Sequence, residues 1–247
     1  MSSSWQEEGA PSQPFQWARR FIPKRLQPYL RGLRKRYNLR GKILDEPYKT
    51  VFTYTQVSRA RQENLVRLVK QIEEMGLPGD LVECGVLDGG TSALLAHASS
   101  ESKRRVHLFD AWEGLPEVTE EDGEGGSKWV GQVVGSPRRV RSVMSKLSIN
   151  PERIIIHRGW FEDTFSEAKI NTVALLHVDC DFYAATQLCL KQWYPILIPG
   201  GFVQFDDYDA FKGCRQAVDE FLGLHPAIDL QTYGDRGVAY YIRKPVE

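Results

Sequence analysis

Four aspartates in this chain follow two short apolar runs. Asp179 and Asp181 come directly after the run VALLHV, and Asp206 and Asp207 come directly after the run GFVQF. Carboxylate oxygens are the ligands that hard cations prefer, so two such pairs brought together predict a divalent-metal site, with magnesium favoured over calcium. The alternative is that these acids are solvated turn residues, which commonly follow a strand.

The apolar runs are the elements that would bring the acids together. Val173–Val178 and Gly201–Phe205 have the composition of internal parallel strands that helices cover on both faces. Open α/β sheets bind ligands outside the carboxyl ends of their strands, which is where these acids would lie. Strand alternation also predicts that Asp179 and Asp181 lie on the same side, so that their roles could be shared or exchanged.

A second candidate site lies earlier in the chain. Leu81–Cys84 is predicted to be a strand, Gly85–Gly90 a glycine-bearing turn, and Thr91–Ala98 a helix. Glycines allow a ligand to approach the backbone, and a helix N-terminus offers free N–H groups, although a tight strand-to-helix turn explains the glycines as well. Arg105–Phe109 is the next predicted strand, and it ends in Asp110, where an acid can bind both hydroxyls of a ribose. The absence of G-x-G-x-x-G argues against NAD.

The remaining pattern completes an α/β fold. A long acidic, glycine-rich segment, 117–137, is predicted to be a lid, and Tyr194–Gly201 is predicted to be a turn. The other expected elements are helices over 55–75, 140–147, 184–193 and from about 212, and strands over 154–157, 228–232 and 238–243. This order predicts an open, mostly parallel Rossmann-like sheet that ends in an antiparallel hairpin.

Composition limits the class of protein. The 247 residues contain no apolar run near the roughly 18 residues that span a bilayer, and the N-terminal residues lack the apolar region of a signal peptide. The four cysteines show no C-x-x-C spacing, so neither a zinc site nor a disulfide framework is expected. A reducing, cytoplasmic location is therefore predicted.

The charge is unevenly distributed. Residues 1–42 hold ten Lys and Arg against two Glu, although the whole chain is neutral. We expect a basic arm over 1–45, disordered over 1–15 and broken into short helical pieces by Pro23 and Pro28, followed by one catalytic domain over 46–247. The arm could contact a membrane surface or an anionic glycolipid, or it could pack on the domain or on a dimer partner. A nucleic-acid partner is not expected, because the remaining chain is acidic and shows no nucleic-acid-binding module.

Several segments together resemble the macrocin-type O-methyltransferases. The matching segments are PGDLVECGVLDGGTS, FDAWEGLPE, GWFEDT, LLHVDCDFYAATQLCLKQWYPILIPGGFVQFDDY and KGCRQAVDEF. The resemblance implies a class I methyltransferase fold, S-adenosylmethionine as methyl donor, a divalent metal that is usually magnesium, and a sugar or glycoconjugate acceptor with adjacent hydroxyls. It also implies a homo-oligomer.

The resemblance assigns roles to individual residues. It gives donor binding to Glu83, Gly85, Thr91, Asp110 and Thr55, metal binding to Asp179, Asp206 and Asp207, and proton removal to Asp181. The chain departs from the family at Leu87 and Asp88, where a Trp and a basic residue are frequent. Trp160 could stack on the purine of the donor or be a buried structural residue.

Two other functions are compatible with these residues. The chain could be a metal-independent methyltransferase whose acids only position the substrate. It could also be a non-catalytic donor-binding protein that its basic arm tethers to membranes.

Overall fold

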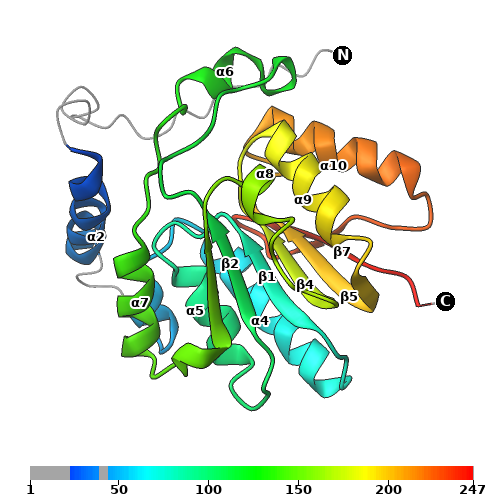
Figure 1. Cartoon of the computed structure of the whole chain (residues 1–247), viewed down its shortest axis with the longest axis horizontal. Coiled ribbons are helices and arrows are strands. Elements are labelled where there is room, and N and C mark those ends of the chain that lie inside the picture. Colours follow the sequence, from blue (N-terminus) through cyan, green and yellow to red (C-terminus); the bar gives the residue numbers. More distant parts are fainter. Residues whose placement is uncertain (1–22, 39–43, 247) are drawn as a thin grey trace.

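A seven-stranded sheet forms the centre of the molecule in the computed structural model, which describes residues 23–38 and 44–246 (Figure 1). The predicted disorder of residues 1–15 lies outside the described residues. The strand order is β3-β2-β1-β4-β5-β7-β6. The strands are β1 Asp80–Cys84, β2 Val106–Asp110, β3 Ile154–Arg158, β4 Val173–Val178, β5 Leu197–Phe205, β6 Gln231–Tyr233 and β7 Ala239–Arg243.

The sheet confirms the predicted α/β class. Strands β1 to β5 pair in parallel, whereas β7 pairs antiparallel with both β5 and β6. The α-helices are α2 Gln27–Asn38, α3 Tyr48–Val51, α4 Arg59–Glu74, α5 Gly90–Ala98, α6 Gly123–Ser127, α7 Pro137–Lys146, α8 Phe161–Thr164, α9 Tyr183–Trp193 and α10 Lys212–Leu224. Ser58 caps α4, because its hydroxyl accepts a hydrogen bond from the Arg61 N–H.

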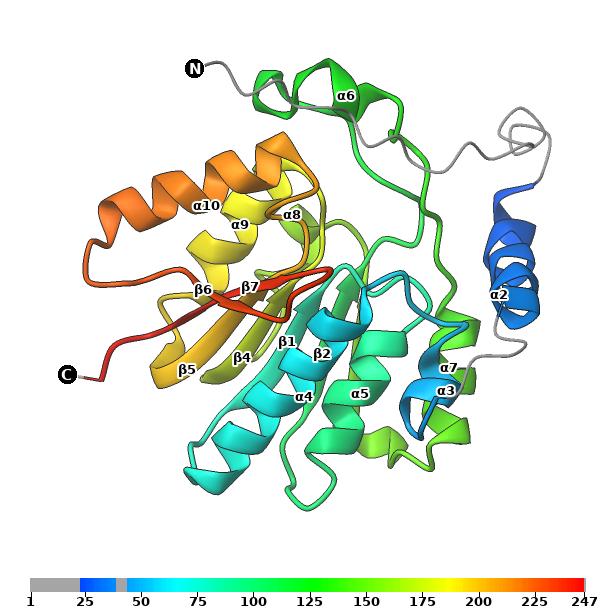
Figure 2. The ribbon, with the colours of Figure 1, turned by 180° about the vertical axis from the view of Figure 1, so that it is seen from behind.

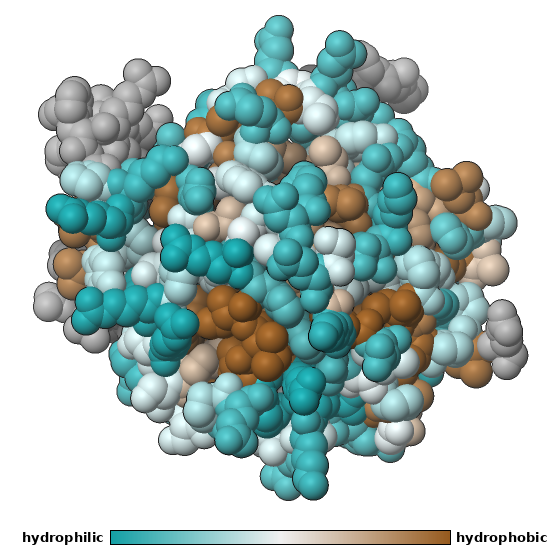
Figure 3. All heavy atoms as spheres, in the orientation of Figure 1, coloured by the Kyte–Doolittle hydropathy of each residue, from teal (hydrophilic) through white to brown (hydrophobic). Residues whose placement is uncertain are grey.

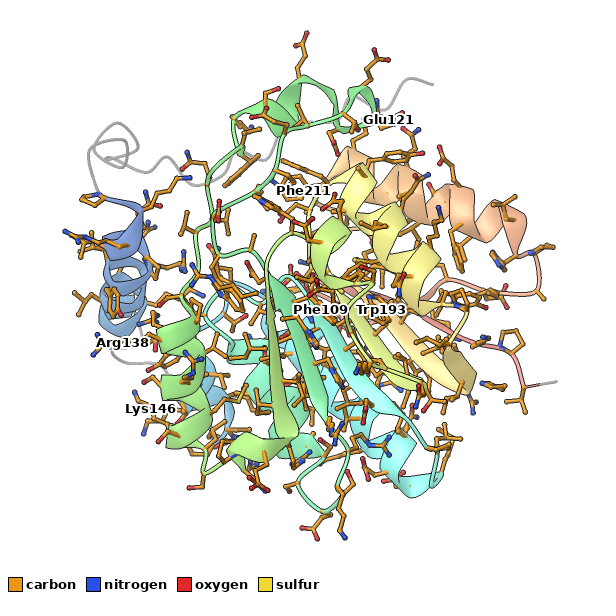
Figure 4. The ribbon with its side chains drawn as sticks, in the orientation of Figure 1. Phe109, Glu121, Arg138, Lys146, Trp193 and Phe211 are labelled. Carbon is orange, nitrogen blue, oxygen red and sulfur yellow. The ribbon has the colours of Figure 1, made fainter. Side chains whose placement is uncertain are left out.

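Helices cover both faces of the sheet and bury two apolar cores. The face covered by α4, α5 and α7 lies opposite the face covered by α8, α9 and α10 (Figures 1 and 2). On the latter face Phe109 of β2 meets Trp193 of α9, with ring centroids 5.2 Å apart (Figure 4). Val173–Val178 is buried along its whole length, which explains why it reads as a continuous apolar run rather than an alternating one.

Three local predictions need correction. The predicted turn Tyr194–Gly201 is wrong in its second half, because β5 begins at Leu197 and an irregular register accommodates its Pro and Gly residues. Pro28 does not break the arm, since it lies in the first turn of α2, where its missing N–H is not needed. The penultimate strand occupies Gln231–Tyr233 rather than 228–232.

None of the described helices is both long enough and apolar enough to cross a bilayer. The cytoplasmic location and the homo-oligomeric assembly stay predictions.

Helix α2 packs beside α7, outside the two layers that cover the sheet (Figures 1 and 2).

Candidate active site

Three of the four predicted acids converge at the carboxyl ends of β4 and β5. Asp179, Asp206 and Asp207 each contribute one carboxylate oxygen to a cluster in which these oxygens lie within 4.8 Å of one another. Asp206 and Asp207 are buried, and Asp179 is partly buried. Such a set of hard oxygen donors is suited to magnesium or calcium.

The backbone brings these acids close to the glycine turn. The Asp179 N–H donates to the Cys84 carbonyl, and the Asp206 N–H donates to the Val178 carbonyl, both at 2.9 Å, so the sheet pairing continues to the acids themselves. Gly85 has a φ of +90°, and a Cβ at this position would lie 1.8 Å from the Asp179 carbonyl oxygen. Glycine is therefore required where β1 and β4 end side by side.

The site carries an excess of negative charge. Burial and the neighbouring Asp206 raise the pKa of Asp207 to about 7. Burial and the surrounding acids also raise the pKa of Asp179 well above its usual range. Arg61 offsets part of this charge, with Nη1 3.4 Å from Asp206 Oδ2, but it also pairs with Asp209.

His177 lies on β4 beside the acids and is fully buried as a hydrogen-bonded core residue. Its Nδ1 lies 2.9 Å from Glu83 Oε1 and its Nε2 lies 3.9 Å from Asp206 Oδ1. Burial opposes protonation of His177, but the contacts with Asp206 and Glu83 outweigh burial and raise its pKa to about 9. No local sequence pattern indicated these contacts, because Glu83 and His177 lie on separate strands that pair only in the folded sheet.

Asp181 occupies a different position from the other acids. Strand β4 ends at Val178, and Asp181 has a φ of +63°, so strand alternation does not extend to Asp181, although both Asp179 and Asp181 line the same cavity. Its backbone N–H donates to Asp207 Oδ2 at 3.0 Å, and its side chain lines the cavity described below. Burial and the charge of Asp207 raise the pKa of Asp181 well above its usual range.

Asp110 holds the glycine turn in place. Its Oδ2 accepts hydrogen bonds from the Val86 and Leu87 N–H groups at 2.8 Å, and its Oδ1 accepts one from the Trp112 N–H at 2.6 Å. Burial raises the pKa of this carboxyl, although these N–H groups favour its charged form. The predicted ribose-binding acid thus also fixes the backbone of the turn, which no sequence pattern indicated.

A cavity of about 390 Å³ joins the two candidate sites. Its lining includes Gly85, Thr91, Asp110, Thr55 and Trp160 together with the four acids. Trp160 is 36% exposed, so it is not a buried structural residue. Glu83 does not line the cavity, because it is fully buried and bonds His177 and Ser92.

The predicted lid closes over the acid end of the cavity. Asp122 anchors it, since Oδ1 accepts from the Tyr183 N–H at 2.8 Å, at the start of α9, and Oδ2 accepts from the Thr119 N–H at 2.9 Å. Trp129 of the lid packs against Phe211, with ring centroids 6.1 Å apart. Phe211 lies beneath the lid helices (Figure 4). These aromatic side chains form one wall of the cavity.

Asp88, where the chain departs from the family pattern, is paired from outside the turn. Its Oδ2 lies 2.7 Å from Arg31 Nη2 and 3.1 Å from Arg139 Nε. Burial raises the pKa of Asp88, and the two guanidinium groups offset this only in part. Helix α2 is thereby attached to the glycine turn.

Comparison with known proteins agrees with this geometry. The profile of the family described as Macrocin-O-methyltransferase (TylF) matches residues 5–240. An 8-demethyl-8-(2,3-dimethoxy-alpha-L-rhamnosyl)-tetracenomycin-C 4'-O-methyltransferase of Streptomyces olivaceus is 34% identical over 184 residues, 71% of this chain and 70% of that protein. A mycinamicin III 3''-O-methyltransferase of Micromonospora griseorubida is 32% identical over 208 residues, 80% of this chain and 81% of that protein.

A solved structure gives the same result. That of the O-methyltransferase NovP superposes with a TM-score of 0.72 at 27% identity, covering 91% of this chain and 100% of NovP. The resemblance seen in the sequence is thus confirmed, and so is the class I methyltransferase fold. The chain belongs to the macrocin O-methyltransferase family and is an S-adenosylmethionine-dependent O-methyltransferase.

Proposed function

We propose that this enzyme transfers the methyl group of S-adenosylmethionine to a hydroxyl of a sugar, free or carried on a natural product or glycoconjugate, and that it requires a divalent cation such as magnesium. The observation that carries the proposal is the convergence of Asp179, Asp206 and Asp207 in the same cavity as the glycine turn. A donor bound at the turn and an acceptor bound at the acids would share one enclosed space.

The three acids are suited to binding a cation, because without one their negative charges repel. Among the described residues, Asp206 Oδ1 is buried without a hydrogen-bond partner, and the pKa of Asp207 is raised to about 7 by burial and by Asp206. Buried carboxylates this close repel one another unless a positive charge lies between them. When bound, a dication would neutralise this charge and lower the pKa of a nearby sugar hydroxyl.

The protein side chains supply the other requirements of the reaction. Asp181 lines the cavity beside the three acids, and its raised pKa suits a general base that takes the hydroxyl proton. We assign donor contacts to the cavity residues Gly85, Thr91, Asp110, Thr55 and Trp160, and an indirect role to Glu83 through His177. Holding both reactants in line accelerates a direct displacement.

The acceptor class follows from two observations. The two relatives named above are methyltransferases whose names specify 4' and 3'' positions, and one name specifies a rhamnosyl group. The aromatic wall formed by Trp129, Phe211 and Phe182 offers apolar contact to the face of a sugar ring or to an attached ring system. Two adjacent hydroxyls would allow the acceptor to bind the cation at two points.

Methyl transfer should be measured against a panel of glycosides that carry adjacent free hydroxyls, with their mono-O-methylated counterparts as matched controls. We expect turnover of some diols, loss of turnover in EDTA, and recovery with excess magnesium. Full turnover in EDTA would overturn the metal requirement and leave a metal-independent methyltransferase. Tight donor binding by calorimetry without transfer to any member of the panel would instead favour a donor-binding scaffold.

A further inference from the structure

Helix α2 exposes its apolar residues and packs on the domain through its other face. Leu26, just before α2, and Tyr29, Leu30 and Leu33 within it are 46, 38, 44 and 61% exposed. They recur at the i, i+3, i+4, i+7 spacing of a single helix face. Half of the eight large exposed apolar residues in the described part of the chain belong to this stripe, which we call the α2 stripe.

The opposite face of α2 is fixed to the domain. Pro28 and Gly32 are buried, and a Cβ on Gly32 would lie 2.6 Å from the Arg139 guanidinium, so the contact is close. Arg31 bonds Asp88 at 2.7 Å and the Val134 carbonyl at 3.1 Å, and the Lys35 ammonium donates to the Thr55 carbonyl. Turning the α2 stripe inward would break all of these contacts and leave Asp88 with Arg139 as its one cationic partner among the described residues.

This arrangement is the reverse of the usual surface helix. Helix α4 buries Leu65, Leu68, Val69 and Ile72 and exposes charged residues. An exposed apolar stripe on a helix that is attached to the domain through its other face indicates a surface that binds a partner.

The charge of α2 indicates the chemistry of that partner. The segment from Lys24 to Asn38 carries six Lys and Arg and no acid. Arg25 and Arg34 are exposed, and helical spacing places them on either side of the α2 stripe. A symmetric contact between two α2 helices would bring like charges together. A lipid surface with anionic headgroups satisfies both features, since it accepts apolar side chains below and cations above.

We propose that α2 binds the surface of an anionic membrane through the α2 stripe and its flanking cations. In Figure 3 apolar side chains lie among strongly polar ones where α2 forms the edge of the molecule. The proposal does not depend on the methyl-transfer reaction.

Membrane binding at α2 would bring the cavity near the lipid surface. Lys24 Nζ donates to the Glu113 carbonyl at 3.0 Å, and the next residues of that segment, Gly114 and Leu115, line the cavity. An acceptor carried on a lipid would then lie near the cavity that the acids line. Helix α2 thus connects the proposed membrane contact to the donor turn and to the lid.

Co-sedimentation of the full chain with vesicles tests the proposal. We expect binding to phosphatidylglycerol–phosphatidylcholine vesicles that weakens in high salt, and little binding to vesicles of phosphatidylcholine alone. Leu30→Ser with Leu33→Ser should weaken binding about tenfold, because two half-exposed leucines lose their burial in lipid. Arg25→Glu with Arg34→Glu should abolish the preference for anionic lipid.

The matched control is Leu224→Ser, which removes a leucine that is 80% exposed and lies outside α2. It should leave vesicle binding unchanged. Circular dichroism and donor calorimetry show that each variant is folded. No binding by the unaltered chain, or equal binding by the leucine variant, would overturn the proposal. A dimer in ultracentrifugation that only the leucine variant dissociates, without vesicle binding, would assign the α2 stripe to a second copy instead.

Discussion

Two sites in this enzyme contain buried acids, and they differ in how many cationic side chains lie beside each acid. Asp88 is fully buried, and two arginines, Arg31 and Arg139, contact one of its oxygens. The group of Asp179, Asp206 and Asp207 has more acids than nearby cations. Arg61 pairs with Asp206 but also with Asp209, and His177 lies 3.9 Å from Asp206 but also pairs with Glu83.

The difference separates a structural contact from a functional site. A buried acid with cations of the protein attaches two segments, and removing it leaves those cations unpaired. Buried acids that outnumber the cations beside them repel one another. The protein therefore keeps them at a cost in stability, and a bound partner that supplies positive charge would offset this cost. The two groups should therefore respond in opposite directions when one acid is neutralised.

The largest effect is expected for Asp207→Asn. Methyl transfer should fall by at least about 100-fold, because the change removes a charged oxygen donor from the centre of the site. The melting temperature without added metal should stay equal or rise, since one of the mutually repelling charges is gone. Initial rates and thermal melts of the same preparation measure both.

Asp229→Asn is the matched control, since Asp229 is exposed and outside the cavity. It should change neither quantity. If Asp207→Asn lost donor affinity in parallel with activity, or if it melted several degrees lower, the cluster would be a structural element and the comparison would fail.

Asp88→Ala should have the next largest effect, and it should be on stability. Loss of the acid leaves two largely buried guanidinium groups without their carboxylate, which costs about 3 kcal/mol in the free energy of unfolding. Urea denaturation measures this value. Arg31→Ala removes only one of the two cations and should destabilise less, and a stability of Asp88→Ala equal to the unaltered enzyme would contradict the assignment.

The acids suited to metal binding and the strands of the sheet are both predictable from the sequence, because both are local features. A run such as Val173–Val178 is buried on both faces, and its end is marked by the first charged residue, so both strand and site are local features. The position of Asp181 was missed because strand alternation ends with the strand, and its backbone turns into the left-handed region. The β5 boundary was missed because Pro and Gly in the strand have the composition of a turn.

Long-range pairs were not predictable in this way. Asp88 lies 57 residues from Arg31, and Asp122 lies 61 residues from Tyr183, and nothing in either local pattern names the partner. The amphipathic period of α2 shows which residues share a face, but contacts with the rest of the chain decide which face is buried. Asp122 is informative because it adds a third way of holding a buried acid, through N–H and O–H donors without a cation.

Asp122→Ala should therefore have an intermediate effect, confined to the lid. It removes the acceptor for the Tyr183 and Thr119 N–H groups, a loss of about 1–2 kcal/mol in the anchoring of the lid. Hydrogen exchange of segment 117–137 should become faster, while the sheet stays protected. Glu124→Ala, an exposed acid of the same lid, is the control, and equal exchange in both variants would exclude an anchoring role.

The smallest effect is expected at His157, a partly buried side chain that is uncharged at neutral pH. The Nε2 atom of His157 on β3 lies 3.0 Å from Nδ1 of His107. Burial together with His107 lowers the pKa of His157 to about 4. In the unfolded chain this histidine binds a proton below about pH 6.5, whereas in the folded protein it does so only near pH 4. The unfolded state thus holds more protons between these values, so stability should fall as the pH falls from about 6.5 to 4.

His157→Gln should flatten this part of the stability curve. The expected difference is about 1 kcal/mol or less, because His157 is only partly buried and water screens the effect. Urea denaturation at pH 7 and pH 5 measures it, with His97→Gln, an exposed histidine at the end of α5, as the control. An unchanged slope for His157→Gln would mean that the acid sensitivity arises elsewhere, and that the contrast between charged and neutral buried groups does not extend to this strand.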